Sequence, residues 1–260
     1  MAPLMPTVGT NIGSIALTSF QILYCASYWA EISSPTPYSR FALPPTSSSP
    51  TSSISSRSGM LIIYTPALLV SLISFLTSPS LNGREHLSSF LLILHFGKRV
   101  LEVSFLHKYS GTMPLSIASL IATTYAITSG SVLLQQRTVA AYGGGIPVVA
   151  LLGFVFGQAG NFYHHYLLAS LRVSGTKGQV VSSRYVLPSG GLFSLCVSPH
   201  YFFEVISWFS FGAVCHHLNA YLAALGMACY LAGRSVSNQR WSEDKFDGWK
   251  RKKNMIPFIF

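Results

Sequence analysis

The chain has 260 residues, of which 50% are hydrophobic and only 9% are charged, and its mean hydropathy is +0.44. A soluble domain usually carries about a quarter charged residues, so this composition excludes an ordinary water-facing surface and predicts lipid around much of the protein. The formal net charge of +10 does not predict nucleic acid as a partner, because the basic residues lie at expected helix ends and in the tail, without interleaved aromatic residues.

Seven apolar segments are long enough to cross a membrane as helices. They are 12–30, 60–77, 87–106, 114–135, 146–171, 198–215 and 217–236. A Ser/Thr/Pro-rich linker at 33–58 separates the first two segments and cannot form a packed core by itself. We therefore predict an all-α, polytopic membrane protein with about seven transmembrane helices in one bundle, in which 1–32 is the first transmembrane helix and 59–260 is the main domain.

The basic residues predict how this bundle is oriented. If the C-terminus is cytoplasmic and the chain alternates through seven spans, only Arg84 and Arg137 fall on the opposite side. Lys98 and Arg99 lie within a span, and the rest of the 17 Lys and Arg residues fall on the cytoplasmic side. Cytoplasmic loops are enriched in Lys and Arg, so the N-terminus is expected to be lumenal and the C-terminus cytoplasmic.

The run HFGKRVLE places ionisable side chains inside the third span. Glu102 follows Lys98 by four residues and Arg99 by three, so the three side chains can share one stripe of a helix. A structural ion pair, or basic side chains that extend to the membrane surface, would explain the run without a site. A role in a binding or catalytic site is favoured, because placing a glutamate side chain against lipid costs free energy.

The run GQAGNFYHHYLLASLR gives a second polar stripe, in the fifth span. Gln158, Asn161, His165 and Arg172 lie close to one helical face, whereas His164 points about 100° away from His165. Amide, imidazole and guanidinium groups in one stripe suit a polar ligand with phosphates. The alternative is a set of hydrogen bonds that hold helices together.

A third polar group follows in RYVLPSGG and SPHYFFEVISW. Gly190 and Gly191 predict a tight connection whose backbone can approach a ligand. His200 and Glu204 are one helical turn apart, and Tyr201 adds a phenolic hydroxyl. By itself, this group is no stronger evidence for a functional site than an ordinary polar helix end. Its predicted place at the same cytoplasmic face as the other two groups favours a shared site.

Several nucleotide and metal motifs are missing from the sequence. No GxGxxG follows an expected strand, and no GxxxxGK[ST] occurs, so neither a Rossmann domain nor a P-loop is expected. The four cysteines lie in apolar stretches without metal-ligand spacing, and the His-His pairs lack the further His boxes of a di-iron enzyme. We therefore expect no metal.

Several runs together resemble the steroid 5α-reductase family (3-oxo-5-alpha-steroid 4-dehydrogenase), which includes the very-long-chain trans-2-enoyl-CoA reductases. The runs are HFGKRVLEVSFLHKYSGTMPL, GNFYHHYLLASLR, YVLPSGGLFSLCVSPHYFFEVISWFSFG and the ending IPFIF. They extend over roughly 57–260, so that 59–260 is expected to be the reductase-like domain. The phrases SSRSGMLIIYTPA, HKYSG and GNFYHH are most similar to the plant branch.

The resemblance implies seven helices around an NADPH site, in the endoplasmic reticulum membrane. It also implies an oxidoreductase reaction in which hydride passes to the β-carbon of an α,β-unsaturated carbonyl lipid and a proton then reaches the α-carbon. Such a reaction needs a group that stabilises the enolate oxygen and a dry cavity. The substrate is expected to be a Δ4-3-oxo steroid, with a trans-2-enoyl thioester as the alternative.

The resemblance also assigns roles to single positions. The cofactor-binding residues that it implies are Lys98, Arg99, Asn161, Arg172, Tyr185, Gly190, Gly191, His200, Glu204, Arg234 and Asn238. Glu31 matches the position of a catalytic glutamate, and Glu102 belongs to the polar helix on which the enoyl-CoA reductase branch depends.

The sequence departs from the family at two places. Phe96 stands where animal steroid reductases have a catalytic tyrosine, so another hydroxyl must activate the carbonyl, and Tyr201 is the candidate. In WSEDKFDGWK, Ser242 replaces a tyrosine that contacts the cofactor. These changes leave a second reading open, in which the chain is a catalytically impaired paralogue that acts as a membrane scaffold. A transporter is a weaker third reading, because no internal repeat is present.

Overall fold

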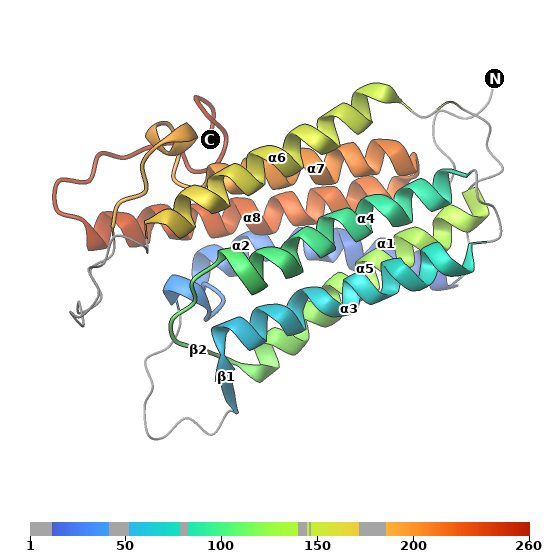
Figure 1. Cartoon of the computed structure of the whole chain (residues 1–260), viewed down its shortest axis with the longest axis horizontal. Helices are drawn as coiled ribbons and strands as arrows, with labels where there is room; N and C mark the ends of the chain where they lie inside the picture. Colours follow the sequence, from blue (N-terminus) through green and yellow to red (C-terminus); the bar gives the residue numbers. More distant parts are fainter. Residues whose placement is uncertain (1–11, 42–51, 79–82, 140–144, 146, 172–185) are drawn as a thin grey trace.

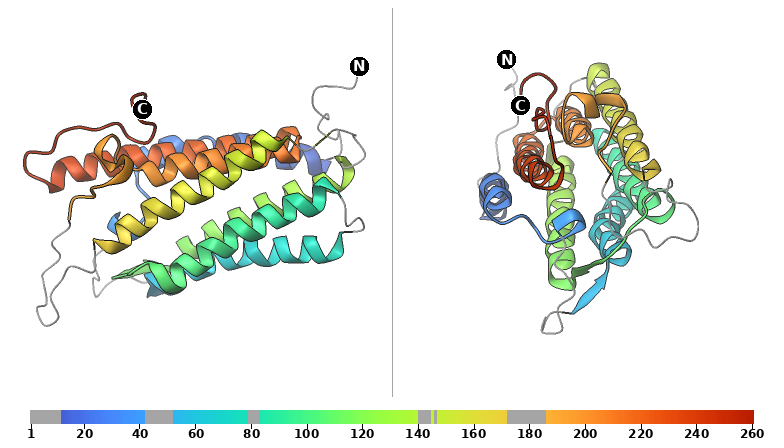
Figure 2. Two further views of the ribbon diagram at one scale, coloured as in Figure 1. Left: turned by 45° about the horizontal axis from the view of Figure 1, so that its top comes forward. Right: turned by 90° about the vertical axis from the view of Figure 1, so that its left-hand side faces the viewer.

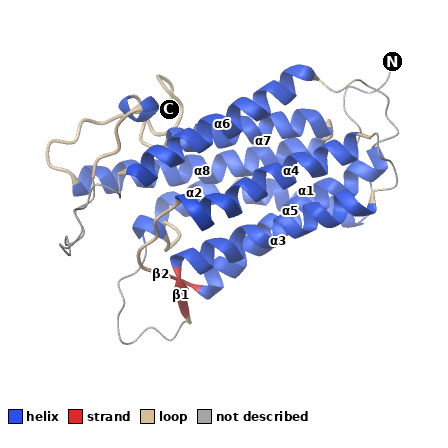
Figure 3. Ribbon diagram, in the orientation of Figure 1, coloured by secondary structure: helices blue, strands red, loops and turns tan. Residues whose placement is uncertain are grey.

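The computed structural model describes residues 12–41, 52–78, 83–139, 145, 147–171 and 186–260. Within these ranges the fold is helical apart from two three-residue strands (Figure 3), so the predicted all-α class is confirmed. The helices are α1 (Ile12–Tyr24), α2 (Ser27–Ser33), α3 (Ser56–Thr77), α4 (Arg84–Leu101), α5 (Leu115–Val139), α6 (Val148–Ser170), α7 (Pro199–Cys215) and α8 (Leu218–Lys245). Short turns of other helix types are η1 (Ser39–Phe41), η2 (Glu102–Leu106) and η3 (Gly191–Ser194).

The long helices run along the longest axis of the molecule and form one bundle (Figure 1). In the end-on view of Figure 2, α5 lies near the centre, with α3 on one side and α1 and α2 on the other. α6 packs on α7, α7 packs on α8, and α3 packs on both α4 and α5. α1 and α2 pack on α8, so the N-terminal helices reach the rest of the bundle mainly through the C-terminal one.

Two described helical stretches, Ser56–Thr77 and Leu115–Arg137, are long and apolar enough to cross a membrane. α1 and α7 are shorter, with 13 and 17 residues, whereas about 20 residues are needed to span a bilayer. α4 includes charged side chains, which lowers its hydropathy. Large apolar side chains such as Ile73 and Val149 are exposed on the outer faces of α3 and α6. The count of seven spans and their orientation stay predictions.

The predicted first span, 12–30, is not one continuous helix. It is interrupted after Tyr24, and α2 then continues to Ser33. The predicted linker at 33–58 is also shorter than expected. Its start packs against α8, whereas its end forms strand β1 (Ser53–Ser55) and the first turn of α3, where Ser55 Oγ accepts a hydrogen bond from the Ser58 N–H at 3.1 Å. Residues 42–51 lie outside the described residues.

Two backbone pairings close the end of the bundle that carries the N-terminus of α3. β1 pairs antiparallel with β2 (Thr112–Pro114), which fixes the start of α3 beside the start of α5. The C-terminal segment folds back on η3, because the Val197 N–H donates to the Lys253 carbonyl at 2.9 Å and the Lys253 N–H donates to the Leu195 carbonyl at 3.1 Å. The tail is therefore joined to the segment between η3 and α7.

Glycines allow α6 to approach α7 closely. A Cβ atom at Gly157 would lie 2.7 Å from the Phe203 carbonyl oxygen and 2.8 Å from the Ser207 nitrogen, and a Cβ at Gly160 would lie 2.2 Å from the Phe203 ring. Backbone atoms of a packed helix cannot move aside as a side chain can, so position 157 admits only glycine, whereas a Cβ at position 160 would displace the buried Phe203 ring. This close packing sets the spacing of the polar residues on the two helices.

The first prediction concerns this interface. Gly157→Ala should lower the free energy of unfolding by about 1–3 kcal/mol, because the added methyl group overpacks α6 against the backbone of α7. Gly97→Ala is the matched control. Gly97 lies in the interior of α4, where the nearest atom to an added Cβ is 4.0 Å away. Because alanine favours a helix more than glycine does, this variant should leave the free energy of unfolding unchanged or raise it. Thermal unfolding of the two variants in detergent measures the difference, and equal behaviour of the variants would contradict the packing argument.

Candidate functional site

Most of the polar residues predicted for a site meet at one end of the bundle. This end is the one where α4 and α6 finish and α7 begins (Figure 1). The members with hydrogen bonds between these helices are Lys98, Arg99, Glu102, Asn161, His165, His200 and Glu204. Arg172 and Tyr185 were also predicted for the site, but they lie outside the described residues.

The Glu102 carboxylate is the centre of an ion cluster that we call the Glu102 cluster, formed by Lys98, Arg99, Glu102 and His165. Its oxygens lie 3.1 Å from Lys98 Nζ, 2.8 Å from Arg99 Nη1 and 3.1 Å from His165 Nδ1. The Glu102 side chain is only 2% exposed, so its charge must be matched inside the protein. The predicted stripe of Lys98, Arg99 and Glu102 is confirmed, and His165 extends it to α6.

Glu102 is also the first residue of η2, a π-helical turn that continues α4. The sequence predicted a regular span to 106 and did not foresee this change. A π-helical turn alters the angular spacing of side chains and occurs often at functional sites. Lys98, which lies before this turn, and Glu102, which begins it, both contact α6.

Asn161 links the Glu102 cluster to α7. Its Oδ1 accepts a hydrogen bond from Lys98 Nζ, and its Nδ2 donates to the His200 carbonyl oxygen at 2.9 Å and to Glu204 Oε2 at 3.3 Å. Gln158, one turn earlier in α6, lies 2.9 Å from His95 Nδ1. The second predicted stripe therefore faces α4 and α7, as its spacing indicated.

Several buried polar atoms around these residues lack a hydrogen-bond partner. Among the described residues they include Arg99 Nε, Gln158 Oε1 and His200 Nδ1. A buried polar group without a partner costs about 1–3 kcal/mol, and such groups are often satisfied by a bound ligand or water. Donors, acceptors and two cations thus remain available to a polar, anionic ligand.

The glycine turn has the tight geometry that the sequence predicted. Gly190 and Gly191 have φ values of 84° and 49°, which favour glycine over other residues. A Cβ at Gly191 would lie 2.7 Å from His164 Nε2, and the same nitrogen accepts a hydrogen bond from the Leu192 N–H at 3.1 Å. His164 therefore holds this turn, whereas His165 belongs to the Glu102 cluster.

A second buried ion pair joins α2 to α8. Arg234 Nη1 lies 3.0 Å from Glu31 Oε2, and the same guanidinium donates to the carbonyl oxygens of Thr36 at 2.8 Å and Tyr38 at 3.0 Å. Ser237 Oγ donates to the Glu31 carbonyl oxygen at 2.7 Å. Glu31 and Arg234, both predicted for the site, therefore also fasten the N-terminal segment to α8.

Tyr201 and Asn238 lie close to His200. The rings of His200 and Tyr201 are 4.2 Å apart. Asn238 Nδ2 donates to Ser198 Oγ at 3.1 Å. Tyr201 is thus near the predicted cofactor-binding residues, but it does not line the cavity described next.

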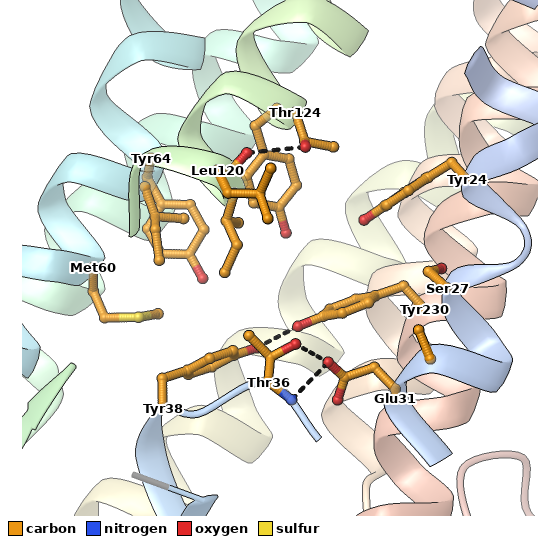
Figure 4. A pocket seen from close by; sticks show the side chains of 14 residues that line it. Tyr24, Ser27, Glu31, Thr36, Tyr38, Met60, Tyr64, Leu120, Thr124 and Tyr230 are labelled. Carbon is orange, nitrogen blue, oxygen red and sulfur yellow. Dashed lines mark hydrogen bonds between the residues drawn. The ribbon is translucent and has the colours of Figure 1, made fainter. Parts of the chain in front are cut away.

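A cavity of about 160 Å³ lies between α1, α2 and α8 on one side and α3 and α5 on the other (Figure 4). Its wall is mainly apolar, but five tyrosines line it: Tyr24, Tyr38, Tyr64, Tyr125 and Tyr230. Glu31 also lines it, at the end where Tyr38 and Tyr230 share a hydrogen bond of 2.8 Å. None of the five tyrosines was predicted from the sequence, because each lies in an apolar or Ser-rich run without a polar stripe.

Tyr64 connects the cavity to the Glu102 cluster. Its hydroxyl accepts a hydrogen bond from Arg99 Nη2, and the Arg99 guanidinium lies 4.7 Å from the centre of the Tyr64 ring. An apolar cavity and a buried polar cluster thus share one wall. The fold and this arrangement define a class: a helical bundle that can bind an apolar ligand and an anionic ligand side by side.

Comparison with known proteins identifies the family within this class. The family model for 3-oxo-5-alpha-steroid 4-dehydrogenase matches residues 111–260, which is more than half of the chain. The chain belongs to the 3-oxo-5-alpha-steroid 4-dehydrogenase family. The matched region includes Asn161, His165, His200, Glu204 and Arg234.

Individual relatives extend the similarity towards the N-terminus. The chain is 28% identical to 3-oxo-5-alpha-steroid 4-dehydrogenase 1 of Macaca fascicularis over 80% of each protein. It is 27% identical to the Homo sapiens protein of the same name over 86% of each. It is also 26% identical to a probable very-long-chain enoyl-CoA reductase of Caenorhabditis elegans, over 69% of this chain and 60% of that protein. The resemblance to the family is confirmed, whereas assignment to a plant branch stays a prediction.

The second prediction concerns the buried ion pair of Glu31. Glu31→Gln should lower the free energy of unfolding by about 3–5 kcal/mol, because it leaves the Arg234 charge buried without its carboxylate. Glu243→Gln is the matched control, since Glu243 pairs with the largely exposed Arg251 at 3.6 Å and such a pair contributes at most about 1 kcal/mol. Thermal unfolding in detergent gives both values. Similar small losses in both variants would show that the pair does not hold α2 to α8.

Proposed function

We propose that the chain is an NADPH-dependent reductase of the carbon–carbon double bond of an α,β-unsaturated carbonyl lipid, and that this lipid is a Δ4-3-oxo steroid. The observation that carries the proposal is the shared wall at Tyr64, which places a tyrosine-lined apolar cavity against the buried Glu102 cluster. Membership of the 3-oxo-5-alpha-steroid 4-dehydrogenase family supports the same reaction class.

NADPH fits the residues at this end of the bundle. Lys98 and Arg99 supply positive charge for phosphates, while Asn161, His200 and Glu204 supply neutral and acidic groups for hydroxyls and amides. The atoms of Gln158 and His200 that lack partners add an acceptor and a further ring nitrogen. When bound, NADPH supplies the hydride that the reaction needs. Arg172, Tyr185, Arg234 and Asn238 belong to this proposal through the family resemblance.

The remaining chemistry falls to the chain's own side chains. Negative charge develops on the carbonyl oxygen during the reduction, so a hydrogen-bond donor must meet this oxygen in a site without water. The resemblance makes Tyr201 a candidate donor and assigns catalytic roles to Glu31 and Glu102. Glu31 lines the cavity, whereas Glu102 holds Arg99 in place.

The second candidate substrate is a trans-2-enoyl-CoA. The relatives include a protein named as a probable very-long-chain enoyl-CoA reductase, and basic residues lie at the end of the bundle where the Glu102 cluster opens. The tyrosine-lined wall favours the steroid, because a rigid planar ligand with few oxygens fits apolar walls with a small number of hydroxyls. A paralogue with impaired catalysis that serves as a scaffold is the remaining alternative.

We further propose that the protein is a multi-pass protein of the endoplasmic reticulum membrane. Two of the described helical stretches are long and apolar enough to span a bilayer, and large apolar side chains on the outer faces of α3 and α6 favour lipid contact. The site would then lie at the cytoplasmic end, where a soluble cofactor is accessible.

The third prediction is the activity itself. Purified protein in detergent with NADPH should oxidise the cofactor when progesterone is added. A trans-2-enoyl-CoA, tested in parallel, should give much slower turnover. Faster turnover of the trans-2-enoyl-CoA would identify this second candidate as the substrate. NADPH binding without turnover of either substrate would support the scaffold, and no NADPH binding at all would overturn the reductase proposal.

The fourth prediction concerns the cofactor site. Lys98→Gln should weaken NADPH binding at least tenfold, or about 1.4 kcal/mol, because it removes a partly buried cation from the Glu102 cluster. Arg137→Gln is the matched control, since it removes a cation paired with Glu85 at the opposite end of the bundle. Titration of NADPH fluorescence measures both. Equal affinities would place the cofactor elsewhere.

A further inference from the structure

Tyr64 is placed differently from the other hydroxyls of the cavity. It lies on α3, is 5% exposed, and points into the space between the two groups of helices (Figure 4). Its oxygen accepts a hydrogen bond from Arg99 Nη2. Because a guanidinium only donates, the hydroxyl hydrogen of Tyr64 is not used in this contact. Within the described part of the chain, the hydroxyl oxygen bonds to Arg99, which leaves the hydroxyl hydrogen for a ligand in the cavity.

The other lining tyrosines lack this combination. The hydroxyls of Tyr38 and Tyr230 bond to each other at 2.8 Å, and the Tyr125 hydroxyl donates to the sulfur of Met227 at 3.9 Å. Among the described lining tyrosines, Tyr64 is the one whose hydroxyl is hydrogen-bonded to an arginine. A cation beside a phenol favours negative charge on its oxygen, which makes the hydroxyl a stronger donor.

We propose that Tyr64 is the catalytic residue that hydrogen-bonds the carbonyl oxygen of the substrate, and that Arg99 positions and polarises it. The inference rests on the proposed reductase function. It differs from the assignment of the same role to Tyr201, because Tyr64 lines the cavity and Tyr201 does not.

The reaction balances with Tyr64 in this role. The β-carbon gains the hydride, the π electron pair of the double bond moves towards the carbonyl oxygen, and the Tyr64 hydroxyl donates its hydrogen bond to that oxygen. One proton, taken up from bulk solvent once the site reopens, then reaches the α-carbon as the C=O bond re-forms, so the product has gained one hydride and one proton. The hydroxyl of Tyr64 keeps its hydrogen over the cycle, and Arg99 stabilises the charge that the hydrogen bond shifts onto the phenol.

The position of Phe96 is consistent with this assignment. Its ring is fully buried, 5.5 Å from the ring of Tyr125, whose ring in turn lies 5.9 Å from that of Tyr64. Phe96 thus packs behind the cavity wall, while Tyr64 places a hydroxyl from α3 in that wall. Arg99, one turn after Phe96 on α4, directs this hydroxyl.

The test compares the turnover of the Tyr64→Phe variant with that of two other variants, each of which also loses one tyrosine hydroxyl. Tyr125→Phe removes a hydroxyl from the same cavity, and Tyr201→Phe removes the alternative candidate. For the substrate that the wild type reduces, Tyr64→Phe should lower kcat roughly 100-fold with NADPH affinity unchanged. The loss of kcat in Tyr64→Phe should be at least tenfold larger than the loss in Tyr125→Phe or in Tyr201→Phe. A large loss in Tyr201→Phe with a normal Tyr64→Phe would overturn the proposal.

A second readout does not depend on turnover. The substrate, labelled with ¹³C at its reactive carbonyl, is bound to each protein without NADPH and its C=O stretch is recorded by difference infrared spectroscopy. The stretch should lie at lower frequency in the wild type and in Tyr125→Phe than in Tyr64→Phe. If Tyr64→Phe does not fold, 3-fluorotyrosine at position 64 keeps the hydroxyl and should lower the frequency further.

The two proposals fail in different ways. A wild type that reduces neither substrate contradicts the reductase function. A wild type that turns over normally, with equal carbonyl frequencies in the wild type and Tyr64→Phe, contradicts only the role of Tyr64.

Discussion

The Glu102 carboxylate is the interaction on which this end of the bundle depends. Two cations and an imidazole converge on it from α4 and α6, and burying any of them alone would be costly. Because Arg99 is held by Glu102, its second nitrogen can reach Tyr64 on α3. Lys98, also held, reaches Asn161 and through it α7. One carboxylate therefore sets the relative positions of four helices.

The pair of Glu31 and Arg234 applies the same constraint on the opposite side of the cavity. It fastens α2 and the segment up to Tyr38 to α8, and the Arg234 guanidinium stacks 4.1 Å from the ring of Tyr38. The cavity thus lies between two groups of helices: the Glu31–Arg234 pair holds α2 to α8 on one side, and Arg99 of the Glu102 cluster bonds to Tyr64 of α3 on the other. Neither pair lies in the middle of the cavity, which stays mainly apolar with hydroxyls on its wall.

The sequence predicted the parts of this arrangement that depend on local spacing. Apolar length marked the main helices, and intervals of three and four residues placed Lys98, Arg99 and Glu102 on one stripe. Glu31 and Arg234 were identified by family resemblance. Their contact joins residues more than 200 positions apart in the sequence, so no local pattern predicts it. For the same reason the sequence missed the order in 34–41, which depends on α8. Tyr64 gave no signal either, because it stands alone in an apolar run and its partner lies on another helix.

The distance between Phe96 and Tyr64 in sequence hides their proximity in space. A site needs a hydroxyl at the substrate oxygen, but not a hydroxyl from a particular helix. In this bundle α3, α4 and α5 bring Tyr64, Phe96 and Tyr125 into one aromatic row, in which Tyr64 and Tyr125 line the cavity and Phe96 packs behind them. A hydroxyl on α3 can therefore serve the cavity without one from α4. α4 must still provide the cation that donates a hydrogen bond to the Tyr64 hydroxyl, which is Arg99. Arg99 meets that need only because Glu102 offsets its charge, so loss of the carboxylate would disturb the cofactor side and the substrate side of the site together.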